Sequence, residues 1–311
     1  MKNRSCSKQC LSKYIGEQLF WVVFAVGDTL GVKRVVELAT VSNAEAQVTK
    51  VNFQWRIKPT FSPEHGVLIV WFGSVLIGAA LAQHWNYCTN LVLLCSFFAL
   101  QAEHPLVVQL KQRSTLKPRY AIWAGVYGAI AIFIAGYLSI MSPVLLWIYA
   151  IVGFALIFDV IAVLKRKHKS ILNELVIFAA ICLSTPLAYG ATTGSLSIEV
   201  MTIWILNTLF FGSAIFTIKL RRKKTSSLMP ATAYHLIASA FVSGFFVLGW
   251  LKLFTALAFI VVLIKFAVVI SFRNWYTKAK FHSVALLETR FALIYIAACA
   301  ISVLPAHLPS A

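Results

Sequence analysis

Nine long apolar segments constrain the fold of this chain more than any other feature of its sequence. Each is about 18 to 22 residues long, which is the length of an α-helix that crosses the hydrocarbon core of a membrane. The segments cover residues 66–83, 89–110, 120–140, 144–164, 172–190, 199–219, 232–250, 251–271 and 284–305. We therefore expect an all-α polytopic membrane protein with a nine-helix transmembrane domain over residues 61–311.

The composition excludes a soluble globular protein. Of the 311 residues, 60% are hydrophobic and only 12% are charged, and so few charges could not cover so much apolar surface in water. The net charge of +18 would by itself suggest nucleic acid. However, the Lys and Arg residues gather in alternate loops, so we expect membrane lipids with anionic headgroups, and not nucleic acid, as their partners.

The alternation of basic loops predicts the orientation of the chain. Nearly all Lys and Arg residues lie in residues 1–60 or in the loops after the second, fourth, sixth and eighth segments. Among the intervening loops, Lys252 is the exception. The positive-inside rule then places the N-terminus in the cytoplasm and the C-terminus outside. Residues 1–60 are expected to form a basic cytoplasmic extension that is partly disordered. Their different character also suggests that native translation starts near Val48 or Val51.

Ionisable side chains beside the apolar segments are candidates for a functional site, because a charge at membrane depth is costly unless it is paired or hydrated. Asp159 and Glu174 flank a basic run at residues 165–169, on the side that we expect to be cytoplasmic. Asp159 and Arg166 are seven residues apart, so they would share one helix face. The same spacing separates His104 from Lys111.

These residues predict a polar pocket at the cytoplasmic end of the bundle. Asp159 and Glu174 would be its catalytic carboxylates and would hold a metal or a proton. The candidates for substrate binding are His65, His104, Lys111, Arg113, Arg166, His235, Arg273 and Glu288. The alternative is that these residues snorkel to the surface or form interhelical ion pairs that only fix the packing.

Four short motifs, in this order, resemble the YwiC-like family of bacterial membrane proteins. They are Pro63-Glu64-His65-Gly66, His104-Pro105-Leu106, Phe158-Asp159 with its basic loop and Glu174, and Ala233-Tyr234-His235. The resemblance covers about residues 55–305 and implies a multi-pass protein of the bacterial plasma membrane. The chain departs from the family pattern at Val67, where Ala-Trp is expected after His-Gly.

A more distant likeness is to UbiA-type intramembrane prenyltransferases. Those are nine-helix proteins that bind a prenyl diphosphate through magnesium, which two Asp-rich motifs hold. Phe158-Asp159 is similar to part of the second motif, whereas residues 104–113 replace the first motif and contain no Asp. The likeness implies a lipid phosphate as ligand, but two lone carboxylates are a sparse ligand set for Mg²⁺. The cations Lys111, Arg113 and Arg166 could bind the phosphate directly.

Three functions remain open on the sequence alone. The first is a UbiA-like enzyme, or its relic, that acts on an isoprenoid or other lipid phosphate. The second is a carrier for a small anion, which interruptions of the helices at Pro105 and Pro186 would favour. The third is a non-catalytic scaffold whose basic loops bind anionic lipid or a partner protein.

Overall fold

The computed structural model describes residues 59–62, 65–112, 117–221 and 227–304, all of which belong to one compact unit within Lys58–Ala311. The expectations for residues 1–58, for Arg113 and for the side chain of His65 lie outside the described residues. Every regular element in the described part of the chain is a helix. The predicted all-α class is therefore confirmed.

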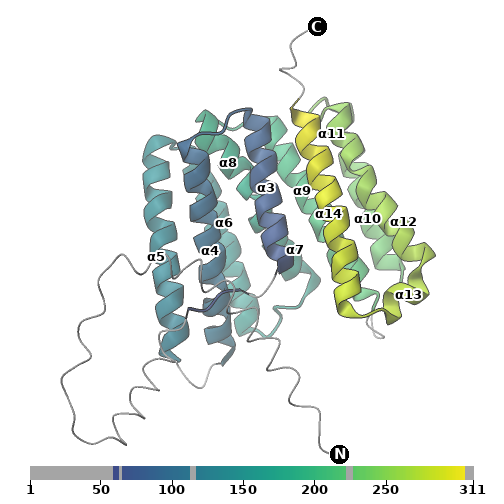
Figure 1. Cartoon of the computed structure of the whole chain (residues 1–311), viewed down its shortest axis with the longest axis horizontal. Helices are drawn as coiled ribbons and strands as arrows, with labels where there is room; N and C mark the ends of the chain where they lie inside the picture. Colours follow the sequence, from purple (N-terminus) through teal and green to yellow (C-terminus); the bar gives the residue numbers. More distant parts are fainter. Residues whose placement is uncertain (1–58, 63–64, 113–116, 222–226, 305–311) are drawn as a thin grey trace, which may run out of the picture. The chain divides into compact units, whose positions relative to one another are not determined.

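The helices lie side by side and are joined mostly by short connections (Figure 1). In chain order they are α3 (His65–Ala82), α4 (Tyr87–Gln112), α5 (Pro118–Met141), α6 (Leu145–Leu164), α7 (Ile171–Cys182), α8 (Ser184–Thr193), α9 (Ile198–Lys219), α10 (Met229–Val247), α11 (Leu253–Ala258), α12 (Ile260–Ser271), α13 (Arg273–Lys278) and α14 (Phe281–Val303).

Eight helices or helix pairs in the described residues are long and apolar enough to cross a membrane, which confirms a multi-pass integral membrane protein. One of these spans combines α7 with α8 (Ile171–Thr193), and another combines α11 with α12 (Leu253–Ser271). The remaining expected span, which is the first in chain order, falls on α3. Its apolar part, Gly66–Ala82, is shorter than the other eight spans.

Turn and cap residues end the helices close to where the sequence predicts. Helix α5 stops just before Ser142-Pro143. Gly194 closes α8 with a φ of 74°, a left-handed conformation that glycine adopts without strain. Ser170 and Ser197 cap the starts of α7 and α9, and each accepts a hydrogen bond from the backbone amide three residues on.

Two of the spans are interrupted within the membrane-spanning length. Helix α7 ends at Cys182 and α8 begins at Ser184, because the ring of Pro186 crowds the carbonyl group four residues earlier. Helix α11 is likewise separated from α12 at Phe259, an interruption that the sequence did not predict. The interruption expected at Pro105 is absent, since α4 continues through that residue.

Helix α9 is the most buried span and packs against α3, α7, α8, α10 and α12. Helices α3 and α8 approach closely at Gly78, where the backbone of Thr185 occupies the place of a side chain. The Thr185 hydroxyl donates a hydrogen bond of 2.9 Å to the Ser74 carbonyl across this contact. Helix α5, in contrast, packs mainly on α4 and leaves large side chains such as Phe133 exposed, as suits contact with lipid.

Consecutive spans run in opposite directions, so alternate turns lie at the same end of the bundle (Figure 1). We call the end that carries the turns after α4, α6, α9 and α12 the basic end. Its described cations are Lys111, Lys117, Arg119, Lys165, Arg166, Lys167, Lys169, Lys219, Arg221, Arg273, Lys278 and Lys280. The turns described at the other end contain one cation, Lys252, which pairs with Glu199 at 3.3 Å.

Candidate functional site

A buried carboxylate and amide connect the last turns of α6 to the first turn of α7. The Ser170 cap starts α7 in such a way that Asn173 faces back toward Asp159. Asn173 Nδ2 donates to Asp159 Oδ1 at 2.7 Å and to the His168 carbonyl at 3.1 Å. Asp159 is only 4% exposed, and its Oδ2 and Asn173 Oδ1 have no hydrogen-bond partner among the described residues.

His168 lies in the turn between these two helices, outside the membrane-spanning segments. Burial lowers the pKa of His168 below its usual value, and the charges of Lys111 and Lys169 lower it further. The carboxylates of Asp159 and Glu174 act on this pKa in the opposite direction. Three of the predicted site residues, Lys111, Asp159 and Glu174, therefore lie near enough to act electrostatically on one imidazole.

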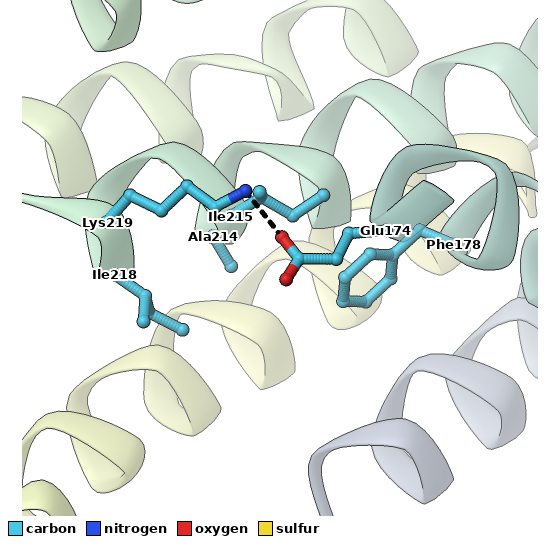
Figure 2. Close-up of a pocket in the computed structure, with 6 residues that line it drawn as sticks. All are labelled: Glu174, Phe178, Ala214, Ile215, Ile218 and Lys219. Atoms are coloured by element: carbon cyan, nitrogen blue, oxygen red, sulfur yellow. Dashed lines mark ion pairs between the residues drawn. The ribbon is translucent and has the colours of Figure 1, made fainter. Parts of the chain in front are cut away.

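An apolar groove lies beside this group, between α7 and α9 (Figure 2). Its cavity volume is about 240 Å³, and Phe178, Ala214, Ile215 and Ile218 form its apolar lining. Lys219 Nζ and Glu174 Oε2 point toward one another across the groove and form an ion pair of 2.8 Å. The groove therefore combines hydrocarbon walls with one charge of each sign at the basic end.

A second polar cluster, which we call the lysine network, lies where α9, α12, α13 and α14 meet. Lys265 is 1% exposed, and its Nζ donates to Ser213 Oγ at 2.8 Å and to Glu288 Oε2 at 2.9 Å. Glu288 Oε1 accepts hydrogen bonds from the hydroxyl groups of Thr217 at 3.0 Å and Tyr276 at 3.1 Å. Burial raises the pKa of Tyr276, in α13 outside the spans, and the Glu288 charge adds to this effect.

His235 is buried beside the lysine network. Its Nδ1 lies 2.7 Å from the Ala231 carbonyl, and its ring stacks on Phe266 with the ring centres 3.9 Å apart. Because a carbonyl group only accepts, Nδ1 carries the hydrogen and Nε2 is left as the acceptor. Among the described residues, Nε2 has no hydrogen-bond partner.

The remaining predicted site residues are spread along the basic end. His104 and Lys111 both lie in α4, as their spacing predicts, and His104 is half-buried. Arg273 opens α13 and is also half-buried. Arg166 does not share a helix face with Asp159, because α6 ends at Leu164 and Arg166 is exposed in the turn with a φ of 58°.

The structure thus brings Lys111, Asp159 and Glu174 together near His168 and Glu288 together with His235, and it leaves the other described candidates apart from both groups. Sequence reasoning missed Asn173, Lys219 and Lys265 as functional candidates. Lys265 carried a signal, since it is a charge inside an apolar segment, and Asn173 directly precedes Glu174. Ser213 and Thr217 are four residues apart on one face of α9, but such hydroxyl groups are common in membrane helices and give little signal by themselves.

The side chains of the basic end do not fit a magnesium ion well. No three His, Cys, Asp or Glu side chains come together as ligands in the described part of the chain. Glu174 is engaged by Lys219, and Asp159 offers one free oxygen, whereas Mg²⁺ requires an octahedral set of oxygen ligands.

Comparison with known proteins supports the resemblance seen in the sequence. The model of one protein family, described as YwiC-like protein, matches residues 61–189. Searches of the curated proteins and of the solved structures found no match. The matched part contains Asp159, Asn173 and Glu174, whereas the lysine network and His235 lie beyond it. Over residues 61–189 the chain is therefore similar to the YwiC-like proteins, as its first three motifs predict. The motif at residues 233–235 lies beyond the match, and the resemblance there stays a prediction.

Proposed function

We propose that this membrane protein binds an isoprenoid phosphate or another lipid phosphate at its basic end, as a UbiA-like enzyme or its relic. The proposal includes nine spans, with α3 as the first, and a cytoplasmic basic end. The observation that carries it is the groove between α7 and α9, whose apolar walls lead to a lysine among basic turns (Figure 2).

The walls of the groove suit the hydrocarbon part of such a ligand. Phe178 and Ile215 face the groove from two helices that pack directly against each other. Small-molecule sites are typically lined by apolar side chains, with a few polar groups that fix the orientation of the ligand. A lipid tail could therefore enter from the side of the bundle, while its head stays at the basic end.

Cations at the basic end suit the phosphate part. Lys219 lies at the groove itself. Lys111 lies in the last turn of α4, and Arg166 is exposed in the turn before α7. A phosphate oxygen would compete with Glu174 for the Lys219 ammonium group, because both form charge-assisted hydrogen bonds with it. Binding would then release the Glu174 carboxylate from its partner.

The other predicted roles follow from this arrangement as proposals. Asp159 and Glu174 remain the candidate catalytic carboxylates, and Asn173 holds Asp159 in place. The further candidates for contact with the substrate are His65, His104, Arg113, His235, Arg273 and Glu288.

A thermal-shift assay of the full chain in detergent, with geranylgeranyl diphosphate as the probe, tests this proposal. At about 100 times its dissociation constant, the probe should stabilise the protein by roughly 2.7 kcal/mol. The double variant Glu174→Gln with Lys219→Met should lose the shift, and it leaves no single charge behind. The matched control, Glu199→Gln with Lys252→Met at the opposite end, should retain it.

Magnesium is the second arm of this experiment. We expect the shift to be the same with and without the ion, because the donor set does not suit it. A shift that strictly requires magnesium would instead make Asp159 a metal ligand. The absence of any shift would overturn lipid-phosphate binding, and recovery of a stoichiometric protein partner would then favour the scaffold.

A further inference from the structure

The connection between α12 and α14 presents cations and aromatic rings at the basic end (Figure 1). It joins the spans Leu253–Ser271 and Phe281–Val303, so in a membrane it lies at the boundary between the hydrocarbon core and the lipid headgroups. We call residues 272–281 the elbow, and the short helix α13 lies within it. Among the exposed side chains of the elbow are Phe272, Trp275, Lys278, Lys280 and Phe281.

Contacts on its inner side hold the elbow in place. Tyr276 is 1% exposed, and its hydroxyl group donates to Glu288 in α14. Arg221, just after α9, donates a hydrogen bond to the Ala279 carbonyl. The guanidinium group of Arg221 also lies over the ring of Phe281, 5.9 Å from its centre. The orientation of the elbow is therefore set from inside the protein, which leaves its exposed side chains directed away from the bundle.

The positive charge of the elbow is not balanced within the described residues. Residues 266–287 contain no Asp or Glu. Glu288, the next acid along the chain, already accepts three hydrogen bonds in the lysine network. None of the ion pairs in the described part of the chain includes Lys278 or Lys280. An external anion can therefore approach both of these cations.

The exposed aromatic side chains indicate which kind of anion fits. Phe272, Trp275 and Phe281 are 48–71% exposed, and they flank the cations of the elbow. Aromatic side chains at the end of a membrane span settle at the level of the lipid headgroups. A free phosphate ion or a soluble acidic protein would leave these rings in water, whereas a phospholipid offers an anion and acyl chains together. An anionic lipid leaflet attracts each neighbouring Lys or Arg by about fivefold in affinity.

The turn after α6 is also basic, but it lacks the other features of the elbow. Its cations at residues 165–169 lie between Asp159 and Glu174 in the sequence. Residues 164–170 contain no Phe, Tyr or Trp. This turn therefore offers similar charge without exposed aromatic rings, and it provides a matched control for the elbow.

We infer that the elbow is a binding site for an anionic phospholipid, in the leaflet at the basic end. The phosphate group of the lipid lies against Lys278 and Lys280, and its acyl chains lie beside the exposed rings. Because Tyr276 connects α13 to Glu288, a bound lipid stabilises the corner where α9, α12, α13 and α14 meet. The site is separate from the groove between α7 and α9, because no residue of the elbow lines that groove.

Tryptophan fluorescence tests this site directly. The full chain and its Trp275→Phe variant are reconstituted in phosphatidylcholine vesicles that contain increasing fractions of a brominated lipid. Bromine quenches a nearby indole, so the difference between the two signals reports the surroundings of Trp275. This difference should be half-quenched at an about tenfold lower fraction of brominated phosphatidylglycerol than of brominated phosphatidylcholine.

Two double variants locate the binding site. Lys278→Gln with Lys280→Gln should remove the preference for phosphatidylglycerol, whereas Lys165→Gln with Lys167→Gln should keep it. All four lysines are exposed, so both double variants should retain the wild-type melting temperature in detergent. An equal preference in the two double variants would overturn the inference, because the attraction would then be spread over the whole basic end.

The lipid arms give two further results that would overturn the inference. Equal quenching of wild type by the two brominated lipids would show no selection for an anionic headgroup. If neither lipid quenches Trp275, a second copy of the chain covers the elbow instead. The groove variant Glu174→Gln with Lys219→Met should keep the preference, so the elbow and the groove can fail independently of each other.

Discussion

Hydrogen bonds from neighbouring polar side chains make the carboxylates of Asp159 and Glu288 compatible with apolar packing. The two carboxylates differ in how completely their oxygens are bonded. Asp159 receives one amide hydrogen bond from Asn173. Glu288 receives three donors, among them the ammonium group of Lys265, so both of its oxygens are satisfied. An unsatisfied buried polar atom costs about 1–3 kcal/mol. The free oxygen of Asp159 therefore destabilises the folded protein more than either oxygen of Glu288 does, and it lies beside His168 and the basic turn.

His168 gives a pH-dependent prediction at the residue scale. Burial and two neighbouring cations lower its pKa from 6.5 in the folded protein. As the pH falls through 6.5, the unfolded chain therefore binds more protons than the folded chain, and the free energy of unfolding decreases. Between about pH 8 and 5, the melting temperature of wild type should fall more than that of His168→Gln. The same pH dependence in both proteins would contradict the lowered pKa.

At the scale of helices, apolar length and turn residues predicted most of what forms. Eight spans lie where the segments lie, and the ends of α5 and α8, at Ser142 and Gly194, fall in the predicted gaps between segments. The break at Phe259 could not be predicted, because the apolar run continues through it without a Pro or Gly. The prediction that Arg166 shares a helix face with Asp159 was also wrong, because the periodicity of 3.6 residues holds only until α6 ends.

The site was less predictable than the spans, for a physical reason. Asp159 meets Asn173 across a turn, and Lys265 meets Glu288 from another helix. Such contacts depend on how helices rotate and pack, which one sequence does not encode as a local pattern. The sequence could therefore mark Asp159 and Glu288 as costly charges, but it could not identify the partners that make them tolerable.

The close contact of α3 with α8 gives a prediction at this scale. A side chain at Gly78 would overlap the carbonyl group of Thr185, which is backbone and cannot move aside easily. Gly78→Val should therefore lower the free energy of unfolding by about 1–3 kcal/mol, the usual cost of overpacking. Gly125→Val on α5 is the matched control, because nothing lies within 4 Å of an added Cβ there. Equal melting temperatures of the two variants would show that this helix contact is not tight.

The whole molecule is organised by an asymmetry of charge between its two ends. The basic end carries the described cations of four turns, the groove and the exposed edge of the lysine network. The opposite end has Lys252, already paired with Glu199. The lipid proposal uses this asymmetry, since a lipid phosphate would bind where cations gather.

The orientation of the molecule is a prediction at the scale of the whole protein. Because Lys and Arg are retained in the cytoplasm, the basic end should face inward and the other end outward. In a variant whose six cysteines are replaced, a new cysteine is placed in an exposed turn at either end, by Lys167→Cys or by His84→Cys. A membrane-impermeant maleimide should label His84→Cys in intact cells and Lys167→Cys only after the cells are opened. The reverse pattern would place the basic end outside, and labelling of both in intact cells would contradict the alternation of the spans.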